Sequence, residues 1–438
     1  MRRPQGCRSQ CLQYNLQSRS DWPKLMRPFL SIAHNTCREC IRQPIFIVIL
    51  LTCVAIIGLY PAMALFVFRG QQKLVTDGSL ASILLFGQIC AVLCASHSIS
   101  REIETGTVQI ILAKPIGRMQ FFLAKLVGVW GAISLFFLIC ALPVLISLKA
   151  ATDQFRFDPY LFSGIFVGIL AACVFGAARN YYARKPFPSA AATGLAAYML
   201  IFGTIAFFMP KWNSFSYEWK EGPAYFNAEV AKELILIYAA IVVMASLATT
   251  LSAFLKLAAN MTICLIIYIF GLMADWIYTN LANIQVSTIE QMIRAWPFWI
   301  LPLILFFWWL STIRYPYRRN PDIPAIEIHA TFVILTGMDL IRCVHDLIEP
   351  PLDIAPSPVL RAVAVTFHRF RSQLAAVIYS ILPNWQQLWL ADAISRQKQI
   401  PWEYIATAGL YTLAFVAFLT ILGIIIFSVQ DLNQSSQI

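Results

Sequence analysis

Long apolar runs separated by short polar segments dominate the pattern of this chain from residue 45 onward. A run of about 20 apolar residues can cross the hydrocarbon core of a bilayer as a helix. Backbone groups in lipid must find their hydrogen bonds within the protein, and a helix satisfies them internally. The pattern therefore predicts an all-α fold, a polytopic transmembrane helical bundle of at least six spans and about eight in all. The candidate spans are 45–68, 79–99, 121–148, 160–178, 189–209, 234–255, 261–278, 296–313 and 404–429.

Shifts in composition divide the chain into consecutive units. A polar extension comes first, and Met26 is an alternative start under one hypothesis. Apolar and basic residues then alternate at helical spacing, which predicts an amphipathic interfacial elbow helix. The order continues with spans one to three, further spans, and a largely polar insert with interfacial or re-entrant helices. A last span with a short tail ends the chain's predicted organisation. The expected boundaries are 1–25, 26–44, 45–148 with a polar cytoplasmic loop at 100–120, 149–320, 321–403 and 404–438.

Charge is scarce and unevenly placed. Charged residues make up 13% of the chain, against about 25% in soluble proteins, so lipid is the expected solvent. The net charge of +11 sits at the ends of apolar runs, which favours membrane orientation and argues against a nucleic-acid partner. The segment before the first span holds eight basic residues and two acidic ones, so this end is expected to be cytoplasmic. The later basic loops expected on that side carry Arg101, Lys114, Arg118, Lys125, Arg179, Arg184, Lys185, Arg314, Arg318 and Arg319.

The orientation rule holds through eight crossings and fails at the ninth candidate. A ninth crossing would place the C-terminus outside, unless one candidate is not a span or another crossing lies within the polar insert. A simple span in that insert is unfavourable because its one apolar run contains Asp339, Arg342, His345 and Asp346. The side of the C-terminus therefore stays open at this stage.

The sequence gives little support for a catalytic site or a metal-binding site. No nucleophile and base pair and no H-E-x-x-H array is present. Cys37 and Cys40 have the C-x-x-C spacing of a metal site, but on a helix they share an apolar face, so no metal is expected. Most other cysteines lie in apolar runs as small hydrophobic residues. We therefore expect no catalytic residue, no metal ligand and no cofactor bound by this chain.

The stretch "SREIETGTVQIILAKPIGRMQFFLAK" at 100–125 breaks the membrane pattern. Gly106 favours a helix break, Thr107 is a suitable N-cap for a short helix, and Pro115 ends that helix. The result is a short helix across the mouth of a helical hairpin, with Ile110 and Ile111 exposed beside charges. Such a surface is typical of a protein contact, and its insertion among lipid headgroups is the alternative.

This stretch resembles the segment that type-2 ATP-binding-cassette (ABC) permeases carry between their second and third spans. The matching residues, in order, are Glu102, Ile103, Glu104, Gly106, Thr107, Leu112, Lys114, Pro115, Arg118, Phe121 and Lys125. The segment before the first span resembles the elbow helix of that family, and the matching residues are Thr36, Arg38, Glu39 and Arg42. "ILPNWQQLWLADAI" at 381–394 resembles a family element before the last span.

The resemblance implies a division of labour between two subunits. This chain is expected to be the permease of an ATP-driven exporter in the bacterial cytoplasmic membrane, paired with a second permease copy or a homologue. A separate ABC ATPase would bind ATP and magnesium, which agrees with the lack of a G-x-x-x-x-G-K-[ST] loop here. The expected ATPase-coupling residues are Glu102, Glu104, Gly106, Thr107, Val108, Ile110, Ile111, Leu112, Lys114, Pro115 and Arg118.

Two alternatives remain from the sequence. An intramembrane lipid- or glycan-modifying enzyme would need clustered acids or histidines, and the one candidate set is Glu327, His329, Asp339, His345 and Asp346. A membrane anchor protein without transport is the other alternative. Neither the residues nor the resemblance selects a substrate.

Overall fold

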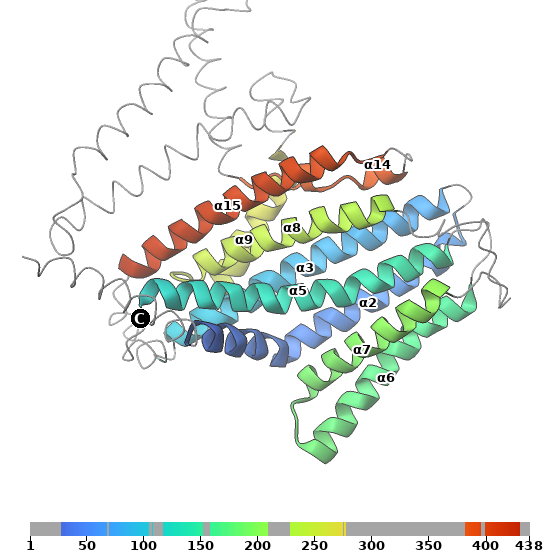
Figure 1. Ribbon diagram of the computed structural model, residues 1–438, viewed down its shortest axis with the longest axis horizontal. Coiled ribbons are helices and arrows are strands. Elements are labelled where there is room, and N and C mark those ends of the chain that lie inside the picture. The colour runs from blue at the N-terminus through green and yellow to red at the C-terminus, as the bar shows by residue number, and fades with distance from the viewer. Residues whose placement is uncertain are drawn as a thin grey trace, which may run out of the picture.

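The computed structural model is a bundle of long helices, in which the described residues contain no strand. The structure describes residues 28–67, 70–104, 107, 117–151, 158–208, 228–274, 276, 382–395 and 399–429. Among these, seven helices are long and apolar enough to cross a membrane. They are α2 (Pro44–Ala64), α3 (Gln71–Glu104), α5 (Arg118–Ala150), α6 (Pro159–Ala183), α7 (Phe187–Phe208), α8 (Ala228–Leu251) and α15 (Trp402–Val429), as Figure 1 shows. The all-α, polytopic prediction is confirmed.

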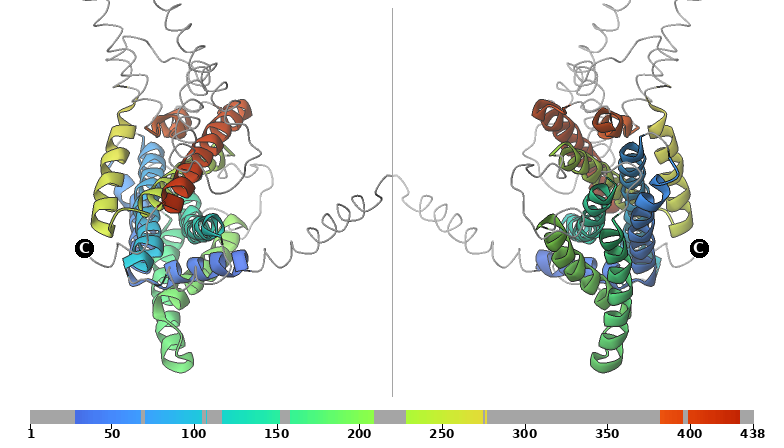
Figure 2. Two further views of the ribbon diagram at one scale, coloured as in Figure 1. Left: turned by 90° about the vertical axis from the view of Figure 1, so that its left-hand side faces the viewer. Right: turned by 90° about the vertical axis from the view of Figure 1, so that its right-hand side faces the viewer.

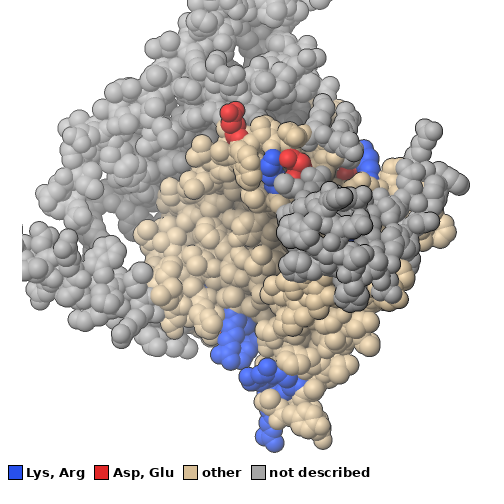
Figure 3. All heavy atoms as spheres, turned by 45° about the vertical axis from the view of Figure 1, so that its right-hand side comes forward, with Lys and Arg blue, Asp and Glu red and all other residues tan. Residues whose placement is uncertain are grey.

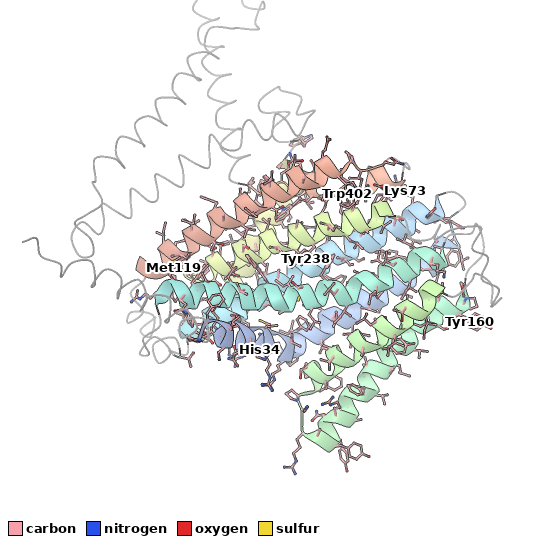
Figure 4. All side chains as sticks on the ribbon, in the orientation of Figure 1. His34, Lys73, Met119, Tyr160, Tyr238 and Trp402 are labelled. Atoms are coloured by element: carbon pink, nitrogen blue, oxygen red, sulfur yellow. The ribbon has the colours of Figure 1, made fainter. Side chains whose placement is uncertain are left out.

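The long helices from α2 to α8 alternate in direction and α15 runs parallel to α8, so the bundle has two distinct ends (Figure 1). His34 and Met119 mark one end, which we call the elbow end, and Lys73 and Trp402 mark the opposite, distal end (Figure 4). The last helix, α15, starts at the distal end and finishes at the elbow end, where Phe427 stacks on Phe121 at a ring distance of 5.7 Å. The end of α15 therefore lies on the same side as the start of α2, which decides the question that the orientation rule left open.

Helix α3 occupies the centre of the bundle and packs on α2, α5, α8 and α9 (Leu257–Leu272). Its middle turns are buried almost all round, as expected for a helix enclosed by other helices. Polar side chains also join the helices. Asn260 of α9 donates to Ser96 Oγ at 2.7 Å, and Ser100 donates to the carbonyl of Leu255 at 2.7 Å. Such interhelical hydrogen bonds satisfy polar groups where no water reaches them.

Several expected boundaries differ from the structure. Lys73 and Asp77 were expected in a loop, but they lie in the first turns of α3, where they form an i,i+4 pair with a 4.0 Å separation. The candidate at 261–278 is α9, which has 16 residues and is shorter than a usual span. The candidate at 296–313 lies outside the described residues.

The segment before the first span is helical over 28–42 and packs against protein with its apolar face. Ala33 and Thr36 lie against α5 at Gly128, where an added Cβ would come within 2.6 Å of the Ala33 carbonyl. The Cys40 thiol donates to the Cys94 carbonyl of α3 at 3.7 Å. A side-chain hydrogen bond with Cys94 and burial raise the pKa of Cys40 well above its ordinary value, and burial raises the pKa of Cys37.

A second helical hairpin, α6–α7, projects from the bundle (Figure 2). Glycines on α6 face aromatic rings on α7, and the Tyr198 hydroxyl donates to the Gly164 carbonyl at 3.0 Å. Small residues let two helices approach closely in a membrane. The two helices of the hairpin pack closely on each other and also on α2 and α5, and the outer faces of the hairpin expose apolar side chains such as Val174 and Leu200.

At the distal end, residues 382–395 and 399–401 fold back over the bundle before α15 begins. It contains a short 3-10 helix, η3 (Gln386–Leu388), and a short α-helix, α14 (Ala391–Ser395). Trp385 is fully buried, its backbone N–H donates to the Gly271 carbonyl of α9 at 3.4 Å, and that of Asn384 donates to the Tyr411 hydroxyl at 3.0 Å.

Candidate coupling site

The predicted coupling stretch joins the end of α3 to the start of α5 at the elbow end. Glu102 and Glu104 lie in the last turn of α3, and Arg118 begins α5. Thr107 is exposed and its hydroxyl donates to the Glu102 carbonyl at 3.2 Å. The other predicted coupling residues lie outside the described residues: Gly106, Val108, Ile110, Ile111, Leu112, Lys114 and Pro115.

Lys125 lies two turns into α5 and is 2% exposed. Its Nζ is 2.6 Å from Glu102 Oε1 on α3 and 3.9 Å from Glu39 Oε2 on the elbow helix. The same ammonium lies 5.7 Å from the ring centroid of Phe121, one turn earlier. We call Lys125, Glu102 and Glu39 the Lys125 cluster, and it connects three helices at one point.

Burial explains why this lysine needs its partners. An ammonium removed from water loses several kcal/mol of solvation, which only close opposite charges and hydrogen bonds restore. Glu102 supplies the short charge-assisted bond, and Glu39 adds a second negative charge from the other side. The two helices that flank the loop, α3 and α5, are therefore fixed to each other and to the elbow helix directly at the loop.

The Lys125 cluster changes the role expected for Glu102. The resemblance made Glu102 an expected ATPase-coupling residue, and the charge pattern placed Lys125 in a basic cytoplasmic loop. In the structure, Glu102 is only 19% exposed and bonds to Lys125 within the same chain. The sequence signal for this was a single lysine inside the apolar run "FFLAKLVGVW", because an intramembrane base is expensive without an acidic partner nearby.

The remaining predicted residues divide into an outward-facing and an inward-facing group. Glu104, Thr107 and Arg118 are exposed at the loop, so they present charge and a hydroxyl at the surface of the elbow end. On the elbow helix, Arg38 and Arg42 are exposed. Thr36 is buried against Gly128 instead, and Asn35 donates to Glu39 at 2.7 Å.

No cluster of three or more metal-ligating side chains occurs within the ranges that the structure describes. The residues that the enzyme alternative would use, Glu327, His329, Asp339, His345 and Asp346, lie outside those ranges.

Seven apolar spans in one chain define a multi-pass membrane protein. The elbow helix, the broken hairpin at the elbow end and the Lys125 cluster all fall within one matched region: residues 30–218 match the model of the ABC-2 family transporter proteins. This match supports an ABC-2 type permease over the first half of the chain, and together with the apolar helices it supports a membrane subunit of an ABC transporter. No curated protein and no solved structure matches the chain.

Proposed function

We propose that this chain is the permease of an ATP-driven exporter and couples to a separate ABC ATPase through the loop between α3 and α5. ATP and magnesium would bind to the ATPase, and this chain would form the translocation path together with a second copy or a homologue. The family match supports a transporter subunit, and the geometry at the loop supports coupling.

The Lys125 cluster is the observation that carries the proposal. It holds α3, α5 and the elbow helix together at the base of the loop, through a 2.6 Å bond between Lys125 and Glu102. A push on this loop would therefore move both flanking helices as one body, because neither can shift alone without separating buried charges. A loop that served only as a turn would not need its two helices fixed at that position.

The exposed residues of the loop are the expected contact points for the ATPase. Glu104 and Arg118 offer charges of both signs, and Thr107 offers a hydroxyl. The predicted apolar contacts of Ile110, Ile111 and Leu112 remain part of this proposal. Glu102 and Lys125 support the loop from inside the chain.

Affinity purification of the full chain from gently solubilised native membranes tests the proposal. Glu104→Lys and Ile111→Asp change the loop surface without touching the Lys125 cluster. Glu403→Lys is the matched control, because Glu403 is an exposed glutamate at the distal end of α15. We expect an ATPase with the parent chain and with the control, and its loss with both loop variants.

The outcome decides among the functions considered. An ATPase that stays bound to both loop variants would contradict coupling through this loop. A chain that copurifies with no ATPase and converts a lipid or a lipid-linked glycan by itself would instead be the intramembrane enzyme. A chain with neither property would be a membrane anchor.

A further inference from the structure

The tip of the α6–α7 hairpin carries all of the charge of that hairpin. Between Pro159 and Phe208 the sequence has three basic residues, Arg179, Arg184 and Lys185, and no acidic residue. All three lie in the last turns of α6 or in the connection to α7. At the lower end of Figure 3, where the hairpin projects, the described surface shows basic side chains and no acidic ones.

Close packing keeps this tip ordered even though residues 180–186 are all exposed. A Cβ added at Gly176 would come 2.9 Å from the Ala191 Cβ, and one added at Gly194 would come 2.6 Å from the Phe175 ring. The two helices therefore touch almost up to the turn. The basic residues stand on a rigid support.

The backbone and the aromatic rings position the basic groups. The Arg179 guanidinium lies over the Phe175 ring, with Cζ 5.5 Å from its centroid. Arg184 ends α6 in the left-handed conformation, with φ 50°. Within the described residues it is the one non-glycine with positive φ. Glycine would occupy this position without strain, so the arginine at this position indicates a use for its side chain.

Two tyrosines complete the tip. Tyr181 and Tyr182 are 81% and 83% exposed, and their rings meet edge to face at 5.1 Å. Exposed tyrosines with an apolar ring and a polar hydroxyl favour the boundary between hydrocarbon and headgroups. The faces of the hairpin behind them expose Val174 and Leu200. The tip therefore leads from a lipid-facing surface to a basic surface at headgroup level.

We propose that the tip of the α6–α7 hairpin, formed by Arg179, Tyr181, Tyr182, Arg184 and Lys185, binds the phosphate groups of anionic phospholipids. Guanidinium groups match phosphate oxygens with two parallel hydrogen bonds, and a lysine adds a point charge. The absence of acids from the hairpin sequence leaves this positive charge uncompensated within it. The tyrosines and the apolar faces point to a lipid rather than a free phosphate, because a soluble anion needs neither.

This site is separate from the proposed coupling loop, and it stands whether or not the chain exports anything. Its rival is the simple role of basic residues in fixing orientation, which requires no bound lipid. The two can be distinguished because orientation and lipid binding are measured independently.

Native mass spectrometry of the purified full chain, with added phosphatidylglycerol or phosphatidylcholine, provides the test. A basic group near an anionic surface contributes about a fivefold change in affinity. We therefore expect Arg184→Gln to weaken phosphatidylglycerol binding about fivefold, and the triple change of Arg179, Arg184 and Lys185 to Gln to weaken it about 100-fold. Phosphatidylcholine binding should change little.

Two further variants control for folding and for bulk charge. Arg184→Gly relieves the positive-φ strain, so a fivefold loss there cannot come from a damaged fold. Lys256→Gln removes an exposed base at the start of α9 and should leave lipid binding unchanged. Cysteine-accessibility labelling in vesicles reports the orientation of each variant.

Three results would overturn the proposal. The first would be that the triple variant binds phosphatidylglycerol like the parent, with or without a change in orientation. The second would be that Lys256→Gln weakens phosphatidylglycerol binding as much as Arg184→Gln does. The third would be that glycerol 3-phosphate displaces the lipid at equal concentration, which would show that the tip binds phosphate without recognising a membrane lipid.

Discussion

The two ends of the bundle bury charge in opposite ways. At the elbow end, the Lys125 cluster joins three helices through side-chain pairs. At the distal end, a second group, which we call the distal cluster, consists of Glu229, Lys232 and Glu233 at the start of α8. Its carboxylates accept backbone N–H groups of the returning segment: Leu390 N to Glu233 at 2.8 Å and Ile400 N to Glu229 at 2.6 Å.

The compensation of charge differs as well. Lys125 has two acidic partners on two other helices, so its removal would leave a carboxylate without its counter-ion. Lys232 pairs with Glu229 at 2.8 Å and donates to the Ile400 carbonyl at 2.7 Å. Glu233 is fully buried, and its second oxygen has no hydrogen-bond partner within the described residues.

This difference suggests two structural purposes. Paired side chains on neighbouring helices resist relative movement of those helices, which would suit the base of the proposed coupling loop. Carboxylates that hold a backbone segment fix a cap on the bundle and leave the helices themselves uncoupled. At the elbow end, side-chain pairs thus fix helices to one another. At the distal end, carboxylates of α8 thus fix the returning backbone segment onto the bundle, and we call this segment the distal cover.

The largest expected effect is at Lys125. Lys125→Met leaves Glu102 without its counter-ion in a mostly buried position, so we expect a loss of about 3–5 kcal/mol in stability. The midpoint of thermal unfolding in detergent measures it. Lys73→Met is the control, because the Lys73–Asp77 pair is half-exposed and should contribute less than about 1 kcal/mol. An equal loss in both variants would remove the distinction between a buried charge pair and a surface pair.

A larger side chain at Gly128 should separate the elbow helix from α5. An added Cβ there would come within 2.6 Å of both the Ala33 carbonyl and the Thr36 Cβ. Gly128→Val should therefore destabilise the chain by about 1–3 kcal/mol through overpacking. Gly409→Val is the control, since nothing lies within 4 Å of a Cβ at that glycine. Unchanged melting of Gly128→Val would show that the elbow helix is not held where the Lys125 cluster requires it.

At the distal end, removing the acceptor should matter more than removing the charge. Glu233→Leu leaves the Leu390 N–H without its partner and should cost about 1–3 kcal/mol. Glu233→Gln keeps an oxygen to accept that bond, so its melting midpoint should stay close to that of the parent. Limited proteolysis within 382–401 reports loss of the distal cover. If Glu233→Gln were as harmful as Glu233→Leu, the charge itself would be essential.

The smallest expected effect lies between the two ends, at Gln88 of α3. This side chain is 3% exposed, and neither amide atom has a hydrogen-bond partner among the described residues. Gln88→Leu should therefore stabilise the chain by about 1 kcal/mol. A rise in melting midpoint together with loss of ATPase-dependent transport would indicate that Gln88 serves the path. A fall in midpoint would show that the amide has a partner in the folded chain.

The sequence predicted the class of fold well and the details of the ends poorly. Apolar runs located the long helices to within several residues, because the requirement for internal hydrogen bonding in lipid acts on each segment separately. It misplaced Lys73 and Asp77 in a loop, because a helix that extends beyond the membrane no longer needs apolar residues. It also could not pair Glu102 with Lys125, since they lie on different helices and 23 residues apart in the sequence.

The sequence by itself determined that this chain has the apolar helices of a multi-pass membrane protein, and that a polar stretch resembling that of the ABC-2 family lies between two of them. Hydrophobicity and local backbone chemistry act on short segments, and the amino-acid order records them directly. Only the tertiary structure decided which charges compensate one another, which carboxylate oxygen has no hydrogen-bond partner among the described residues, and on which side of the bundle α15 ends. Those outcomes depend on which helices meet, and the free energy of a buried charge is set by neighbours that lie far away in the sequence.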